Sequence, residues 1–182
     1  MHRAVRLIYY AREGMLRGAS SWQMLSGLKG PGFGILSQQA PDKRFLLYWL
    51  YYYFNRHLGE QVVEAEGTVP YYTPAQGDDP YTKPGEFAGP LTPLLATVSA
   101  DRRTLYLVIA NGSWERDVPC RVALKGFTPK RAIGVLLSQA GPDAAALLER
   151  KEDAVSDLSL RTAGQEVTFT LPAHSVAFVS LQ

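Results

Sequence analysis

The sequence predicts a mainly β protein in which a helix–strand–helix segment precedes an antiparallel β-sandwich. Apolar residues near the N-terminus recur at the helical period, and a second segment is apolar or aromatic on every side. Beyond residue 94, short runs of strand-forming residues alternate with turn residues, which is typical of a sandwich. The 182 residues, 46% of them hydrophobic and 20% charged, have the composition of an ordinary globular protein.

The first predicted element is a helix from Ala4 to Leu16. Its apolar residues follow the helical period, and its arginines lie mostly on the opposite face. Segment 19–25 is a predicted strand, and the glycine-rich segment 27–34 is a predicted turn. The chain therefore begins with a helix, a strand and a turn.

The second predicted helix runs from about Lys43 to Leu58, with Asp42 as its N-cap and Gly59 as the residue that ends it. It contains Phe45–Phe54, which is apolar or aromatic all round and is therefore expected to be buried on all sides. The run is shorter than the roughly 20 residues that cross a bilayer. Because the rest of the chain offers too little surface to cover it, we expect a missing N-terminal portion or a partner chain to do so.

A different pattern follows Gly59. A strand is predicted at Val62–Ala65, and Pro70–Pro93 is a loop longer than ordinary connections. Asn111-Gly112 is a hairpin signal, and 142–150 adds a predicted helical turn. The strands of the sandwich are predicted at Leu95–Val98, Thr104–Ala110, Pro119–Leu124, Arg131–Leu137, Leu158–Arg161, Glu166–Leu171 and Ser175–Leu181.

Charge and cysteine content exclude several classes of protein. The formal net charge is +2, which gives no electrostatic case for nucleic-acid binding. Cys120 is the only cysteine, so there is no internal disulfide, and His2, His57 and His174 are too scattered for a metal-ligand spacing. No signal peptide opens the chain, which favours a cytoplasmic over a secreted protein if Met1 is the biological start.

Three segments carry a resemblance to a known family. They are the opening helix AVRLIYYAREGMLR at 4–17, the strand LYLVIANGS at 105–113 and the closing FTLPAHSVAFV at 169–179. In this order they resemble the C-terminal portion of retaining glycoside hydrolases of the α-L-arabinofuranosidase type, which have a (β/α)8 barrel followed by a β-sandwich. The resemblance implies the end of a barrel at 1–60, a strand and long connecting loop at 61–93, and a β-sandwich domain at 94–182.

The resemblance also implies that this chain alone is inactive. Such enzymes use two carboxylates, at the ends of the fourth and seventh barrel strands, and both would lie upstream of Met1. No catalytic residue and no cofactor are therefore expected here, and carbohydrate would be bound through the parent barrel. Trp22 and Gln23, with Ser26 a weaker candidate, would lie at the carboxyl end of the eighth strand, where a Trp ring can stack on a sugar. The alternative for Trp22 is a core or interface residue.

Other polar residues have plainer explanations. Glu64 and Glu66 share one face of a strand, which suits the solvated side of an edge strand better than acid–base catalysis. The sequon Asn111-Gly112-Ser113 is better explained by the hairpin. Structural roles are also expected for the following residues: Asp78 and Asp79 in a turn, with a Ca²⁺ contact as the alternative; His174 and Ser175 at the sandwich rim; and Tyr71, Tyr72 and Tyr81 pinning the long loop.

Two rival functions stay open from the sequence. The chain can be a non-catalytic carbohydrate-binding or scaffolding β-sandwich with a helical extension, although the aromatic helix then lacks a burial partner. It can also be a subunit of unrelated function that docks through that helix. A homo-oligomer is compatible with each of these alternatives.

Overall fold

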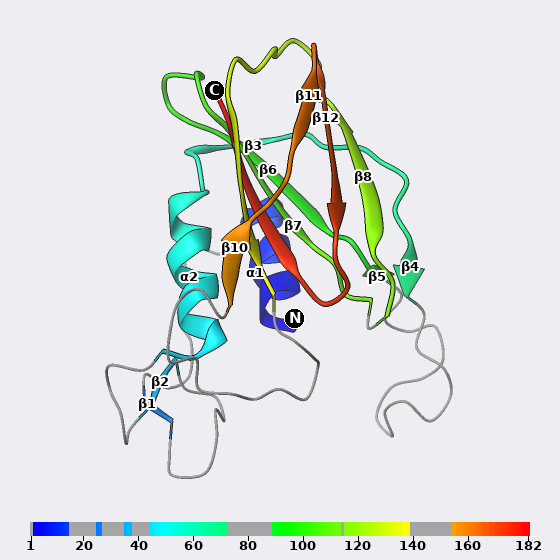
Figure 1. Ribbon diagram of the computed structural model, residues 1–182. Helices are drawn as coiled ribbons and strands as arrows, with labels where there is room; N and C mark the ends of the chain where they lie inside the picture. The colour runs from blue at the N-terminus through cyan, green and yellow to red at the C-terminus, as the bar shows by residue number, and fades with distance from the viewer. Residues whose placement is uncertain are drawn as a thin grey trace.

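The computed structural model describes residues 2–14, 25–26, 35–37, 44–72, 89–113, 115–138 and 154–182. These residues form three layers, with two helices packed on a six-stranded sheet and a three-stranded sheet on its other side (Figure 1). The predicted antiparallel β-sandwich is therefore confirmed. The helices are α1 (His2–Glu13) and α2 (Leu46–Arg56).

Both sheets of the sandwich are antiparallel. The larger sheet has the order β10-β9-β13-β7-β6-β3, and the smaller has the order β11-β12-β8. Their strands are β3 (Gln61–Val63), β6 (Leu94–Val98), β7 (Leu105–Ala110), β8 (Val118–Ala123), β9 (Ala132–Leu137), β10 (Val155–Asp157), β11 (Arg161–Ala163), β12 (Glu166–Leu171) and β13 (Val176–Leu181).

Two short pairs lie outside the sandwich. Strands β1 (Leu25–Ser26) and β2 (Leu36–Ser37) pair in parallel. Strands β4 (Tyr71–Tyr72) and β5 (Gly89–Pro90) pair antiparallel and so bring together the two ends of the predicted long loop.

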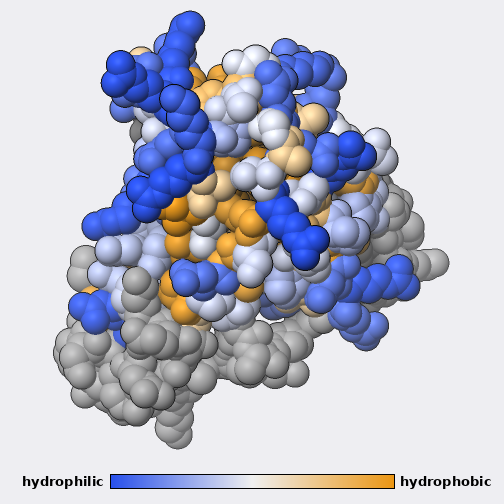
Figure 2. Space-filling model, turned by 45° about the horizontal axis from the view of Figure 1, so that its top comes forward, coloured by the Kyte–Doolittle hydropathy of each residue, from blue (hydrophilic) through white to orange (hydrophobic). Residues whose placement is uncertain are grey.

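The larger sheet is buried on both faces because its central strands are apolar at nearly every position, with Thr97 in β6 and Ser180 in β13 as polar exceptions. Successive side chains of a strand point to opposite faces. Val108 and Phe178 belong to the core under the helices, whereas their neighbours Leu107 and Val179 belong to the core between the sheets. Figure 2 shows apolar surface between hydrophilic side chains at the end of the sandwich.

Both helices bury one face against the larger sheet. Helix α1 contributes Ala4, Leu7 and Ile8 to the first core and lies against β6 and β7. Helix α2 buries Leu50, Tyr53 and Phe54 in the same core. The chain therefore supplies a wall for one side of the aromatic helix, although the sequence predicted that it could not cover this helix on all sides.

The predicted ends of α2 need correction. The helix begins at Leu46 with Phe45 at the N-cap, and Phe45 makes no side-chain capping hydrogen bond. Asp42 is thus not the cap, and it lies outside the described residues. Gly59 does not end the helix in a left-handed conformation either. It is required because a Cβ there would come within 2.4 Å of the Val98 carbonyl oxygen.

The predicted hairpin at Asn111-Gly112 is wrong. Strand β7 before it and β8 after it belong to different sheets. Asn111 is instead fully buried, and its side-chain amide donates to the carbonyl oxygens of Arg116, Leu171 and Pro172 at 2.9, 3.1 and 3.0 Å. Burial also excludes Asn111 as a glycosylation acceptor in the folded protein.

Two other strand predictions change. The predicted strand at Leu158–Arg161 is the crossing between β10 and β11, because the chain passes here from the larger sheet to the smaller. Of the predicted strand at 19–25 only Leu25 lies in a described strand, and the helical turn at 142–150 falls outside the described residues.

Candidate functional site

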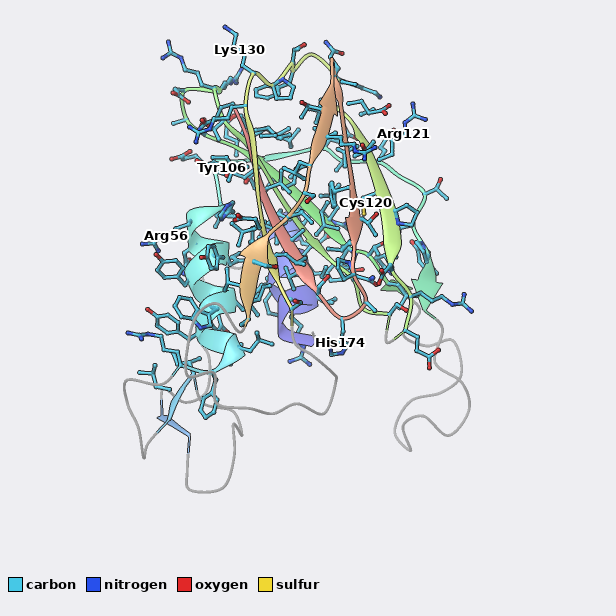
Figure 3. All side chains as sticks on the ribbon, in the orientation of Figure 1. Arg56, Tyr106, Cys120, Arg121, Lys130 and His174 are labelled. Carbon is cyan, nitrogen blue, oxygen red and sulfur yellow. The ribbon has the colours of Figure 1, made fainter. Side chains whose placement is uncertain are left out.

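Helix α2 presents a second, outward face that is as aromatic as its buried one. Residues three or four apart on a helix share a face. One such set, which includes Leu50, Tyr53 and Phe54, is buried against the sheet. The opposite set is half-buried or exposed, and Arg56 within it points away from the sheet (Figure 3). This outer stripe of α2 consists of Tyr48, Tyr51, Tyr52, Asn55 and Arg56.

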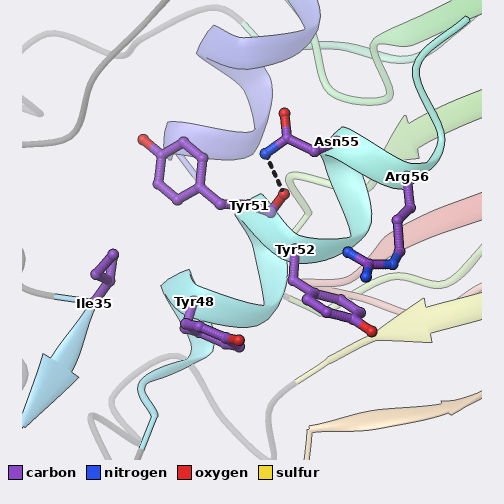
Figure 4. A pocket seen from close by; sticks show the side chains of 6 residues that line it. All are labelled: Ile35, Tyr48, Tyr51, Tyr52, Asn55 and Arg56. Carbon is purple, nitrogen blue, oxygen red and sulfur yellow. Dashed lines mark hydrogen bonds between the residues drawn. The ribbon is translucent and has the colours of Figure 1, made fainter. Parts of the chain in front are cut away.

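The outer stripe lines a shallow groove of about 270 Å³. Ile35, which directly precedes β2, faces the helix across it (Figure 4). Asn55 Nδ2 donates to the Tyr51 carbonyl oxygen at 2.9 Å, one helical turn back. This hydrogen bond fixes the Asn55 side-chain amide against the backbone of α2.

The rings of the outer stripe are ordered by contacts with one another. The Tyr48 and Tyr52 rings lie 6.1 Å apart between centroids with an interplanar angle of 23°. Trp49 packs edge-on to both, at 5.0 and 5.7 Å. Aromatic pairs in such geometries add about 0.5–1.5 kcal/mol beyond the area they bury. The stripe is therefore a preformed surface.

Two arginines cover ring faces of this stripe. The guanidinium carbon of Arg56 lies 3.7 Å from the centroid of the Tyr52 ring, and that of Arg44 lies 4.9 Å from the Tyr48 ring. These are cation–π distances. A sugar stacks on a free ring face, so these two contacts favour a docking surface for protein over a platform for carbohydrate.

His57 lies beneath the same helix and links it to the sheet. Its ring is buried, and its Nδ1–H donates to the Tyr53 carbonyl oxygen at 2.9 Å. The ring also lies 5.5 Å from Phe178 and 6.1 Å from Tyr106. Burial lowers the pKa of His57, the hydrogen bond to Tyr53 partly opposes this, and Arg56 lowers the pKa further. His57 is therefore a neutral core residue and has no catalytic partner in the described part of the chain.

The predicted sugar-binding residues Trp22 and Gln23 lie outside the described residues, as do Asp78, Asp79 and Tyr81. Ser26 lies in β1. The structure thus leaves the substrate-contact prediction untested.

The remaining candidates do not come together in a site. Glu64 and Glu66 are exposed, as expected, but β3 ends at Val63, so they follow the strand instead of sharing one of its faces. His174 lies in the turn between β12 and β13 (Figure 3), and burial lowers its pKa. Cys120 is half-buried on β8, and burial raises the pKa of its thiol to about 11, so it is not a nucleophile at neutral pH.

The described residues hold neither a metal-binding cluster nor a membrane-spanning helix. Within the described segments, no group of three or more His, Cys, Asp or Glu side chains is placed to hold a metal ion. No described helix has the length and apolarity needed to cross a bilayer.

The outer stripe of α2 was not recognised from the sequence as a separate surface. The run Phe45–Phe54 is apolar throughout, so it predicts burial without showing which residues the chain itself covers. The helical spacing of the tyrosines with Asn55 and Arg56 was a signal that could have separated the two faces.

The fold of this chain is similar to part of several solved glycoside hydrolase structures. The chain is similar to a GH51 arabinofuranosidase from Xanthomonas axonopodis pv. citri, with a TM-score of 0.75 and 18% identity over 98% of this chain and 34% of that one. It is similar to a family 51 α-L-arabinofuranosidase from Bifidobacterium longum, with a TM-score of 0.78 and 17% identity over 99% and 34%. A glycoside hydrolase family 30 subfamily 8 xylanase from Clostridium acetobutylicum aligns with a TM-score of 0.56 and 14% identity over 99% and 39%.

No family model matches the sequence, and no curated protein matches it. The likeness to the solved structures confirms the expected fold, a sandwich preceded by helices as in a portion of these larger chains. The chain spans about a third of the length of the two arabinofuranosidases.

Proposed function

We propose that this chain is the C-terminal, non-catalytic part of an arabinofuranosidase-like retaining glycoside hydrolase. Its helices complete a (β/α)8 barrel, and its sandwich covers the flank of that barrel. The parent reaction is retaining hydrolysis of a terminal glycosidic bond, which needs no organic cofactor. Carbohydrate is bound through the parent barrel, and both catalytic carboxylates lie on the part that this chain does not contain.

The outer stripe of α2 is the observation that carries this proposal. The other face of α2 is packed against the sheet, but the tyrosines of the outer stripe remain only half-buried. A preformed aromatic surface of this kind is suited to a further apolar partner. The alignment covers nearly all of this chain and only a third of each arabinofuranosidase. The proposed partner is therefore the preceding part of a barrel, docked on the outer stripe.

The chemistry of the described residues also favours a non-catalytic role. Retaining glycosidases hold two carboxyl groups about 5–5.5 Å apart across the bond they cleave. Glu64 and Glu66, the sequence's closest approach to such a pair, are both exposed, and neither lines the groove along α2.

The coding sequence directly upstream of Met1 gives the decisive test. A reading frame there that encodes a barrel, with Asn-Glu at its fourth strand and Glu at its seventh, would support the proposal. Unrelated sequence upstream would overturn it and would favour the alternative function, a carbohydrate-binding or scaffolding sandwich.

An activity assay tests the same proposal independently. The purified chain is expected to hydrolyse no 4-nitrophenyl α-L-arabinofuranoside, and robust turnover would overturn the proposal. When the chain is co-expressed with the upstream barrel, Tyr52→Lys is expected to lower the recovered complex about tenfold, since a buried charge costs more than 1.4 kcal/mol. Val62→Lys on the edge strand β3 is the matched control, because Val62 is already 48% exposed.

A further inference from the structure

The sandwich contains a second, larger cavity, away from the outer stripe of α2. It is a cleft of about 690 Å³ that lies where the chain crosses from β10 to β11. Pockets that hold small ligands span roughly 300–1,000 Å³. The cleft is therefore large enough for a ligand of a few sugar residues.

The cleft exists because the two sheets are unequal. Strand β11 pairs with β12 only as far as Arg161 opposite Thr168, whereas β12 continues to Leu171. From Phe169 to Leu171, β12 therefore has a strand neighbour only on its β8 side among the described residues. The Leu171 carbonyl oxygen accepts from Asn111 Nδ2. The unpaired backbone groups that precede it on this edge are available to a ligand.

Polar groups of several kinds converge on this cleft. Its lining includes Arg121, Asp157, Ser159, Arg161, Thr168 and Thr170. Asp157 and Arg161 make no ion pair within the described part of the chain, whereas Arg121 Nε donates to Glu166 Oε2 at 2.6 Å across β8 and β12. The apolar side chains of Leu158 and Phe169 form part of the wall and are buried.

The charges of the cleft indicate the class of ligand. Arg121 pairs with Glu166, and the lining adds one further cation, Arg161, and one anion, Asp157. The formal charges therefore cancel, and the site has no net charge that would select an anion or a cation. A guanidinium offers donors, a carboxylate offers acceptors, and the Ser and Thr hydroxyls offer both. A neutral ligand with neighbouring hydroxyl groups satisfies this mixture, because each hydroxyl donates and accepts.

We propose that this cleft is an accessory binding site for a neutral oligosaccharide. It lies on the sandwich itself and goes beyond the docking role proposed for the outer stripe of α2. It needs no barrel, so this chain alone can bind. The site retains a glycan without cleaving it. Phe169 is only 6% exposed and offers no free ring face, so binding relies on hydrogen bonds and is weak.

An NMR titration of the whole chain with xylotetraose and with arabinotriose tests this proposal. At least one of these neutral probes is expected to give saturable shifts of the amides of Arg161, Thr168 and Thr170. The double variant D157A/R161A is expected to weaken that binding at least tenfold. Arg103→Ala removes an equally exposed cation before β7 and is expected to leave it unchanged.

Three results would overturn the proposal. These are no saturable shift with either probe up to 20 mM, undiminished binding by D157A/R161A, or tighter binding of trigalacturonic acid than of both neutral probes. An unchanged amide spectrum outside the cleft shows that each variant is folded. Binding without turnover supports the cleft whatever lies upstream of Met1, so this result and the barrel proposal can fail separately.

Discussion

The side-chain amide of Asn111 donates a hydrogen bond to the carbonyl oxygen of Leu171 at 3.1 Å and thereby joins the two sheets of the sandwich. Asn111 directly follows β7 of the larger sheet, and Leu171 ends β12 of the smaller one. The same amide reaches the carbonyl oxygens of Arg116 and Pro172, and Asn111 Oδ1 accepts from the Ser113 N–H at 3.0 Å. One buried side chain thus joins segment 111–116 to the end of β12.

Asn111→Ala is expected to lower the free energy of unfolding by about 2–4 kcal/mol, because several buried carbonyl groups lose a donor at once. Asn111→Asp is expected to cost at least as much, since it replaces the donor with a carboxylate facing carbonyl oxygens. Urea unfolding measures both. Ser113→Ala is the control: Ser113 Oγ accepts one exposed hydrogen bond, from the Arg116 N–H, so a change below about 0.5 kcal/mol is expected.

Gly59→Ala is expected to destabilise the protein by about 2 kcal/mol, since the added methyl group would overlap the Val98 carbonyl and force the backbones apart. The shift would also lengthen the 2.9 Å hydrogen bond from the Gly59 N–H to Thr97 Oγ1. Thermal unfolding measures the effect. Gly67→Ala provides the comparison, because a Cβ there meets nothing within 4 Å. Equal effects of the two substitutions would contradict this account.

Several elements follow from local sequence alone. The central strands β7 and β13 are predicted because their apolar runs lie between turn residues, and each strand begins one residue later than predicted and ends at the predicted residue. The helical period also predicts α1, although the helix spans His2–Glu13 and so begins two residues before and ends three residues before the predicted bounds, Ala4 and Leu16. In each case the local pattern and the final packing agree.

Other features depend on contacts distant in the sequence. Asn111-Gly112 has the signature of a hairpin, yet the Asn111 side-chain amide donates hydrogen bonds to carbonyl oxygens some sixty residues away. Gly59 is read locally as a helix terminator, although its role depends on Val98. The oligosaccharide cleft likewise depends on how far β11 pairs with β12, and no single segment encodes that register.

Phe178→Ala is expected to cost about 3–5 kcal/mol, since the ring is fully buried. Its ring lies 5.7 Å from Tyr53, so its loss is also expected to loosen α2 from the sheet. Hydrogen exchange should show amides of α2 exchanging faster than those of β13. Leu171→Ala removes an equally buried side chain from the other core and is expected to lower global stability without that local effect. Identical exchange patterns would contradict the division into two cores.

Cys120 is expected to react slowly with iodoacetamide while the protein is folded. Burial raises the pKa of its thiol to about 11, so the thiolate fraction at pH 8 is about two hundredfold below that of an ordinary cysteine near 8.5. Mass spectrometry of alkylation in buffer and in 6 M urea, with free cysteine as the reference thiol, measures the difference. Equal rates for folded and unfolded chain would show that the Cys120 thiol is solvated.

His57 is expected to make stability depend on pH on the acid side of neutrality. Folding lowers the pKa of His57. Above the unfolded value of about 6.5 the ring is neutral in both the folded and the unfolded state, so it does not make the free energy of unfolding depend on pH. As the pH falls from about 6.5 towards the folded pKa, only the unfolded chain takes up the proton. The free energy of unfolding then declines by up to about 1.4 kcal/mol per pH unit.

His57→Gln is expected to flatten this decline, because glutamine keeps an N–H for the Tyr53 carbonyl oxygen but does not titrate. Urea unfolding between pH 4.5 and 8 measures the slope for both proteins. His174→Asn is the matched comparison, since burial also lowers the pKa of His174 and asparagine tolerates its positive φ of 55°. His174 is less buried than His57, so its substitution should remove the smaller share of the slope. A slope that survives His57→Gln unchanged would mean that His57 is protonated in the folded core.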